Sequence, residues 1–322
     1  MPFGRPGPLL HGAVRGRGGS QRNRVSYGST MTMENGNMTY KTIRRVHAAM
    51  RDDIGDLITQ RPVPGPQLDQ IDPFLFLNHH GPQVYPAGNR GLPFGPHPHR
   101  GFETVTFILD GLLAHRDSAG HESVIGPGGV QWMTAGSGLV HAEVSPQEFM
   151  QRGGPLEILQ LWVNLPPALK MTAPRYTGLQ SDQIPVVETP DGKARLHLVA
   201  GEYGGAAGPF ASLTGVFMST VEMQAGARLH LGNLLQRNVF LYVVRGIVRV
   251  EPDSVTAFHL CEFEPDGDEI EIIAERDSLI LLGHAEPIGA PVVAHGPFVM
   301  NTREEINEAI RDYQAGRFGA PI

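Results

Sequence analysis

Two pairs of ionisable residues stand one residue apart in the chain. His97 and His99 flank Pro98, and His141 and Glu143 flank Ala142. In a β-strand, residues i and i+2 point to the same side, about 6.6 Å apart at roughly 3.3 Å per residue. Two imidazoles at that separation can bind one ion, since a metal–nitrogen bond is only about 2.1 Å long. Each pair therefore offers two adjacent metal ligands.

The two pairs form one donor set if their strands lie side by side or face each other across a barrel. Three neutral nitrogens and one carboxylate suit a divalent first-row metal such as iron, and they leave positions open for water, substrate or dioxygen. A single His-x-His pair is more often structural. The second pair, and the Gly-rich turns beside both, favour a metal site.

Short strands must position these residues. The chain of 322 residues holds 40 Gly and 27 Pro, and no long region has clean helical periodicity. Segments such as ETVTFILDG, LEILQLWVNLP and VFLYVVRGIVRVE read as strands bounded by Gly or Pro, which is typical of an all-β sandwich or barrel. Asp110-Gly111 and Arg245-Gly246 each end an apolar strand, and we interpret this as a weak internal repeat of two related β-barrels.

The last segment predicts one short α-helix. Asn301 or Thr302 can cap it, and acidic residues follow in its first turn. Ile306 and Ile310 lie four residues apart, on one face.

The residues around the two pairs resemble cupin motifs. Gly91, His97, His99, Glu103 and Gly111 follow the first cupin motif with one extra residue before Gly111. The second motif is matched by Gly136, Gly138 and His141. Four segments together resemble the pirin branch of the cupins, from about Thr39 to near Phe318: HPHRGFETVT, QWMTAGSGLVHAE, LQLWVNLP and HGPFVMNTREEINEAI.

This resemblance implies a bicupin, with two jelly-roll-like antiparallel β-barrels packed face to face. It implies that His97, His99, His141 and Glu143 bind one divalent metal ion per chain, with Fe²⁺ as the first candidate, in the N-terminal barrel only. Glu103 is then not a ligand. For some members the resemblance also implies quercetin 2,3-dioxygenase activity.

The expected domains are an Arg/Gly-rich disordered tail at 1–38, an N-terminal cupin barrel at 39–174, and a metal-free C-terminal barrel with the helix at 175–322. Met31, Met33 and Met38 are alternative starts within the tail.

Two functions follow. One is a dioxygenase that cleaves a small aromatic, flavonol-like substrate with O₂, in which Glu143 is both ligand and general base. The other is a non-enzymatic, iron-dependent regulator that binds a transcription factor or a metabolic enzyme. The ligand set serves both.

Composition excludes other classes. The net charge of −7 and the lack of a basic stripe argue against a nucleic-acid-binding protein. No apolar run approaches the roughly 18 residues that a membrane-spanning helix needs. The single Cys261 is expected to be a buried strand residue in a reducing compartment. We expect a monomer in the cytoplasm, with the nucleus as an alternative in a eukaryote.

Several further residues carry weaker signals. Glu103 is expected, by strand parity with His97 and His99, to support a ligand or to lie at the barrel mouth. Asn78-His79-His80 is assigned to a loop, at the pocket mouth or on the surface. Trp132 and Trp162 are expected in the core, and Arg100 and Phe102 to fix the turn after the ligand pair. The isolated histidines of the C-terminal half are expected to be structural: His197, His230, His259, His284 and His295.

Overall fold

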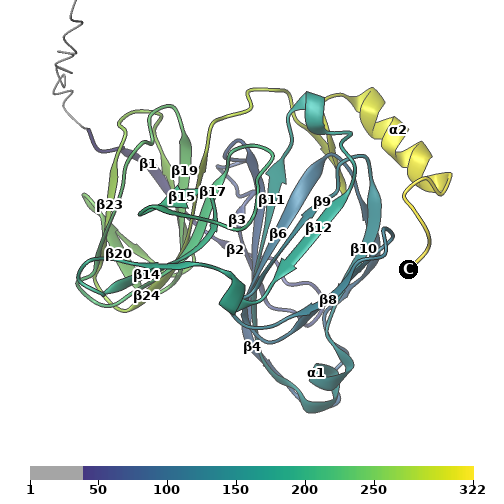
Figure 1. Cartoon of the computed structure of the whole chain (residues 1–322), viewed down its shortest axis with the longest axis horizontal. Coiled ribbons are helices and arrows are strands. Elements are labelled where there is room, and N and C mark those ends of the chain that lie inside the picture. The colour runs from purple at the N-terminus through teal and green to yellow at the C-terminus, as the bar shows by residue number, and fades with distance from the viewer. Residues whose placement is uncertain (1–38) are drawn as a thin grey trace, which may run out of the picture. The chain divides into compact units, whose positions relative to one another are not determined.

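The computed structural model describes residues 39–322, so the expected tail at 1–38 lies outside the described residues. The described chain is almost entirely antiparallel β-structure, as the turn-rich sequence predicts, and forms two β-sandwich domains (Figure 1). Among these residues no helix is long and apolar enough to cross a membrane.

The first domain is a sandwich of a seven-stranded and a four-stranded sheet. The larger sheet has the order β12 (Arg175–Leu179), β9 (Val130–Thr134), β6 (Phe102–Asp110), β11 (Gly154–Asn164), β4 (Phe74–Tyr85), β3 (Thr59–Val63) and β2 (Met50–Arg51). The smaller sheet has the order β5 (Phe94–His99), β10 (Leu139–Val144), β7 (Leu113–Asp117) and β8 (Glu122–Ile125).

The second domain repeats this arrangement, which is the internal repeat that the sequence suggests. Its larger sheet has the order β1 (Ile43–Ala48), β22 (His259–Phe263), β19 (Asn238–Arg245), β24 (Ser278–Ala285), β17 (Phe217–Met223), β14 (Ala194–Ala200) and β13 (Val186–Glu188). Its smaller sheet has the order β18 (Arg228–Leu231), β23 (Ile270–Ala274), β20 (Ile247–Val250) and β21 (Asp253–Thr256). Gly111 after β6 and Gly246 after β19 have φ of 88° and 86°, a backbone conformation that favours glycine.

Short elements complete the described chain. They are the pairs β15 (Glu202–Tyr203) with β16 (Ala206–Ala207) and β25 (Val293–His295) with β26 (Phe298–Met300), the helices α1 (Gln147–Arg152) and α2 (Arg303–Gln314), and the 3₁₀ turns Pro167–Leu169 and Ser181–Gln183. The predicted C-terminal helix is α2. Thr302 is its N-cap, and its hydroxyl accepts the backbone N–H of Glu305 while the Glu305 carboxylate accepts that of Thr302. Ile306 is buried on its inner face.

The two larger sheets pack face to face through a shared apolar core. Phe107 and Leu161 from the first sheet belong to the same buried cluster as Phe240 and Leu281 from the second. The rings of Phe74 and Phe240 meet edge to face, with centroids 4.8 Å apart. Side chains on the opposite face of the first sheet point into the first domain, toward β5 and β10, because strand residues alternate between faces.

Sheet membership does not follow the expected boundary at 174/175. Strand β1, from the first segment, pairs with β22 in the second domain, with Val46 opposite Cys261. Strand β12, from the second segment, pairs with β9 in the first domain, with Thr177 opposite Trp132. In Figure 1, β1 in purple accordingly lies among the green strands of the second domain. Cys261 itself is fully buried, as expected, and burial raises the pKa of its thiol to about 12.

The C-terminal segment returns to the first domain after β24. Val299 donates its N–H to the Arg100 carbonyl at 3.0 Å, and the Arg100 guanidinium donates to Asp312 in α2 at 2.9 Å. Arg100 also lies over the ring of Phe318, 4.7 Å from its centroid. Arg100 therefore fixes the turn after the ligand pair, as the sequence predicts, by joining that turn to α2.

Gly101 permits this close approach, and its replacement is expected to be costly. Its φ is +89°, and a Cβ there would lie 2.0 Å from the Val299 carbonyl oxygen. We expect Gly101→Ala to lower the free energy of unfolding by roughly 2–5 kcal/mol, from backbone strain and overpacking combined. Equilibrium urea unfolding measures this change.

Gly120→Ala is the matched control. Gly120 has a φ of +93°, but a Cβ there would meet nothing within 4 Å. The control should therefore show the backbone strain alone, about 1–2 kcal/mol. Equal losses in the two variants would contradict the proposed steric contact with Val299.

Candidate metal centre

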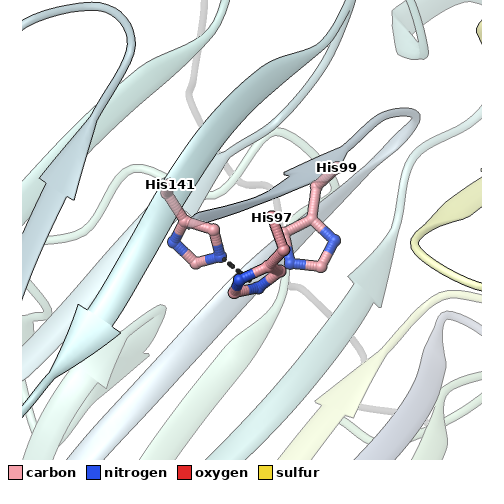
Figure 2. A group of neighbouring side chains, drawn as sticks. All are labelled: His97, His99 and His141. Carbon is pink, nitrogen blue, oxygen red and sulfur yellow. Dashed lines mark hydrogen bonds between the residues drawn. The ribbon is translucent and has the colours of Figure 1, made fainter. Parts of the chain in front are cut away.

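Strand pairing in the smaller sheet brings the two predicted pairs together. β10 is antiparallel to β5, and His141 lies directly opposite His97. His99 follows on the same face of β5. Figure 2 shows the three imidazoles converging. Their donor atoms all lie within 4.8 Å of one another, and no other group of three such residues occurs within 39–322.

Backbone carbonyls orient two of the three imidazoles of this triad. Nδ1 of His97 donates to the Gly95 carbonyl at 2.8 Å, and Nδ1 of His99 donates to the Pro297 carbonyl at 3.3 Å. A carbonyl only accepts, so the proton of each neutral ring is on Nδ1 and Nε2 carries the lone pair. Pro297 lies in the C-terminal segment, which therefore supports a ligand of the first domain.

The distance between His97 and His141 matches metal coordination. Their Nε2 atoms are 3.0 Å apart, and Figure 2 marks this contact with a dashed line. Two ligands at right angles, each about 2.1 Å from an ion, are also about 3.0 Å apart. Without an ion, a proton on His141 Nε2 makes the contact a hydrogen bond, and Nδ1 of His141 is then buried without a partner among the described residues.

The electrostatics favour neutral rings. Burial, with a smaller contribution from the neighbouring His97, lowers the pKa of His99 to about 3. Burial also holds the pKa of His141 well below its usual value, with His99, His97 and His115 adding to the effect. A neutral imidazole is the form that binds a metal ion. His97 is only half-buried, so it is the ring of the triad most exposed to solvent.

Glu143 lies in the same interior but outside the close group of nitrogen donors. Its side chain is 2% exposed. Oε1 accepts hydrogen bonds from Thr106 Oγ1 at 3.0 Å and from Gln131 Nε2, and Oε2 accepts one from Gln160 Nε2 at 2.6 Å. All three donors belong to the larger sheet, so Glu143 joins the two sheets of the domain.

The donor set fits a divalent cation. Within 39–322 no Lys, Arg or His forms an ion pair with Glu143, so the buried carboxylate has only neutral donors around it. Three neutral imidazoles in the same interior supply no positive charge either. A cation bound by the triad and Glu143 would compensate the buried charge.

Aromatic side chains pack behind His99. Phe102 and Trp162 contact its ring edge to face, with centroids 5.0 and 5.5 Å away. Trp162 also stacks on Phe76. Trp132 lies on the other face of the sheet, stacked on Phe210. Both tryptophans are packed in protein cores, as the sequence predicts.

Sequence reasoning missed a second polar group in the interior. His115 lies opposite Glu143 on β7, stacks on Tyr176 with centroids 3.9 Å apart, and contacts Asp117 through Nε2 at 3.1 Å. Asp117 also accepts from His121. Strand parity is a signal that could have indicated this inward pair, because His115 and Asp117 share a strand face with the apolar Leu113.

The prediction for Asn78-His79-His80 was wrong, because these residues lie in β4 and not in a loop. All three are buried. His79 faces the second domain, and Tyr242 of β19 contacts its Nδ1 at 3.0 Å. Glu157 of the neighbouring strand β11 contacts its Nε2 at 2.9 Å. His80 contacts Thr59 at 2.9 Å.

The parity argument for Glu103 was also wrong. The turn at Arg100-Gly101 separates β5 from β6, so alternation does not continue from His99 to Glu103. Phe102 faces His99, whereas Glu103 faces the second domain and accepts a hydrogen bond from Thr134 Oγ1 at 2.6 Å. Burial raises the pKa of Glu103 to about 6, although Thr134, Trp132 and Arg175 lower it in part.

This raised pKa predicts a pH dependence of stability. The native state keeps the proton of Glu103 up to about pH 6, whereas an unfolded chain releases it near 4.5, so stability falls as pH rises through this window. A carboxyl pKa raised from 4.5 to about 6 corresponds to about 2 kcal/mol of folding free energy. Glu103→Gln should remove this contribution, so its unfolding free energy relative to wild type should rise by about 2 kcal/mol between pH 4 and pH 7. A difference that is constant across this range, measured by urea unfolding, would contradict the assignment.

The histidines of the second domain lie apart from one another. His230 contacts Glu269 at 3.1 Å, His259 contacts the Ala257 carbonyl at 3.0 Å, and His284 accepts a hydrogen bond from Arg237 at 2.7 Å. Burial, together with the charge on Arg237, lowers the pKa of His284 to about 3. These contacts are structural, as the isolated spacing predicts.

Known proteins share this architecture. Two family profiles match the chain: "Pirin" at residues 56–163 and "Pirin C-terminal cupin domain" at 218–319. A pirin-like protein of Caulobacter vibrioides is 42% identical over 255 residues, which cover 79% of this chain and 90% of that protein. The crystal structure of a quercetin 2,3-dioxygenase from Acinetobacter baumannii matches 88% of this chain and 100% of its own, with a TM-score of 0.83 and 32% identity. The bacterial pirin YhhW of Escherichia coli, in complex with nickel(II), matches 76% of this chain and 99% of its own, with a TM-score of 0.59 and 22% identity. The chain therefore belongs to the pirin family.

Proposed function

We propose that the first domain binds one divalent metal ion, with Fe²⁺ preferred, through His97, His99, His141 and Glu143, and that the protein cleaves flavonols with dioxygen. The observation that supports this most is the convergence of three neutral imidazoles beside a buried carboxylate that has no positive partner among the described residues. Nitrogen and carboxylate donors together suit iron and its first-row neighbours.

Hydrogen bonds within the protein hold these donors in place. The Gly95 and Pro297 carbonyls orient two imidazoles, and three neutral donors of the larger sheet orient Glu143. Fixed ligands lose little freedom on binding, which raises affinity.

A flavonol presents a hydroxyl at position 3 beside a carbonyl at position 4. The half-buried His97 marks the side from which a flat substrate reaches the triad. The carboxylate of Glu143 takes the proton of the 3-hydroxyl as a general base. The amides of Gln131 and Gln160 keep that carboxylate oriented. When bound, the metal ion supplies a common binding position for the substrate and dioxygen.

A relative supports the choice of substrate. The Acinetobacter baumannii protein whose structure matches 88% of this chain is described as a quercetin 2,3-dioxygenase. The second domain, whose histidines make structural contacts, contributes the face against which the first domain packs.

The test is turnover by the protein loaded with iron. Purified protein with about one iron per chain is mixed aerobically with quercetin, and flavonol loss, oxygen uptake and carbon monoxide release are followed together. We expect all three to proceed in equal amounts. No turnover at full iron occupancy would contradict the dioxygenase proposal and would favour the non-enzymatic regulator.

A further inference from the structure

A cavity lies between the two domains, on the face of the first domain's larger sheet that points away from the metal centre. Its volume is about 150 Å³. The first domain contributes Glu103, Trp132 and Arg175 to its lining, and the second contributes Phe210. None of these residues takes part in the proposed oxidation.

Glu103 presents an unsatisfied oxygen in this cavity. Its side chain is 1% exposed, and Oε1 accepts the Thr134 hydroxyl. Oε2 is buried and makes no hydrogen bond of normal geometry within 39–322, although the Trp132 side chain lies close enough to lower the pKa of Glu103. A buried carboxyl oxygen without a donor costs free energy, so such atoms usually have a partner in the functional state. A ligand that donates a hydrogen bond would supply one.

Arg175 gives the cavity a positive group. It is exposed on the edge strand β12, and no ion pair joins it to a carboxylate of the described chain. Its guanidinium can bind a carboxylate through two parallel hydrogen bonds.

Two aromatic residues also line the cavity. The rings of Trp132 and Phe210 are stacked, with centroids 5.7 Å apart and planes at 26°. A cavity of about this volume holds one benzene-sized ring. The cavity therefore combines an apolar surface for one ring with an acceptor and a cation.

We propose that this cavity binds a small hydroxylated aromatic carboxylate. The ligand hydroxyl donates to Glu103 Oε2, its carboxylate pairs with Arg175, and its ring packs on Trp132 and Phe210. A hydroxyl is preferred to an ammonium as the donor, because an ammonium would bring a second charge into a buried site and would lose its hydration.

The experiment is isothermal titration calorimetry with 4-hydroxybenzoate as the probe and benzoate as its analogue without the hydroxyl. We expect wild type to bind 4-hydroxybenzoate about tenfold more tightly than benzoate, the effect of one hydrogen bond to a charged acceptor. Glu103→Gln should reduce this preference, since an amide oxygen accepts more weakly than a carboxylate. Arg175→Gln should weaken both ligands about tenfold.

Controls separate this cavity from the metal centre. Arg228→Gln removes an exposed arginine of the second domain that pairs with Glu271 at 3.0 Å, and it should leave both affinities unchanged. Protein freed of metal should bind the probe as tightly as loaded protein. Arg175 is exposed, so its variant tests the site even if Glu103→Gln fails to fold. The proposal is overturned by an absence of saturable binding at millimolar probe, by affinities that neither variant changes, or by binding that requires the metal.

Discussion

Alanine at both His97 and His141 is expected to reduce the metal content of the protein from about one ion per chain to a trace. These two rings face each other with Nε2 atoms 3.0 Å apart, so the double variant removes two of the four proposed ligands and the closest pair among them. His99 and Glu143 alone would leave most coordination positions to water. The measurement is elemental analysis after loading with Fe²⁺ and removal of free metal.

The matched control exchanges two histidines of the second domain. His230→Ala with His259→Ala removes the same chemical groups, but these side chains contact Glu269 and a backbone carbonyl of their own domain. This variant should keep one ion per chain. Retention of a full equivalent by the His97, His141 variant would contradict the ligand assignment, and about two ions per wild-type chain would contradict a metal-free second domain.

The local part of the metal centre could be predicted from the sequence. Residues i and i+2 share one face of a strand whatever the strand packs against. The placement of His97 and His99 on one face could therefore be predicted from their spacing alone. The pairing of β5 with β10, which places His141 opposite His97, is a contact between distant segments. Its prediction depended on the resemblance to cupin motifs.

The donors around Glu143 could not be predicted in the same way. Thr106, Gln131 and Gln160 are polar residues in strands whose inward-facing neighbours are mostly apolar. Their polarity indicates that something polar faces them, but only the packing of the two sheets shows that all three meet one carboxylate. Polar residues at inward positions of apolar strands thus indicate that a polar site exists, but they do not show which residues contact each other in it.

Strand alternation gave a wrong prediction for Glu103 because the backbone turns between His99 and Glu103. Glu103 is four residues from His99, which in an unbroken strand places both on one face. Gly101, with its φ of +89°, ends that alternation, and Glu103 therefore faces the second domain. The exchange of β1 and β12 between the domains could not be predicted from local sequence patterns either, because each strand pairs with a strand that is distant in the chain.

Glu143→Gln is expected to reduce flavonol turnover by roughly 10²–10⁴-fold at matched metal occupancy, the range for loss of a general base. Glutamine keeps the shape of the side chain and one oxygen donor, but it has no charge and no basic carboxylate. Its amide would also face Gln160 Nε2, a donor now 2.6 Å from Oε2, so Gln160 must reverse its own amide to restore a hydrogen bond. Metal affinity should fall modestly, because three imidazoles remain.

The comparison must be made between proteins that carry the same amount of metal, since loss of the ion would also abolish turnover. Glu148→Gln is the matched control: it makes the same substitution at an exposed glutamate of α1 that pairs with Arg152, and it should turn over as wild type does. Equal rates for wild type and Glu143→Gln at equal occupancy would exclude Glu143 as the base while leaving it as a ligand. A large fall in rate with the metal retained would show that Glu143 does more than hold the ion in the site.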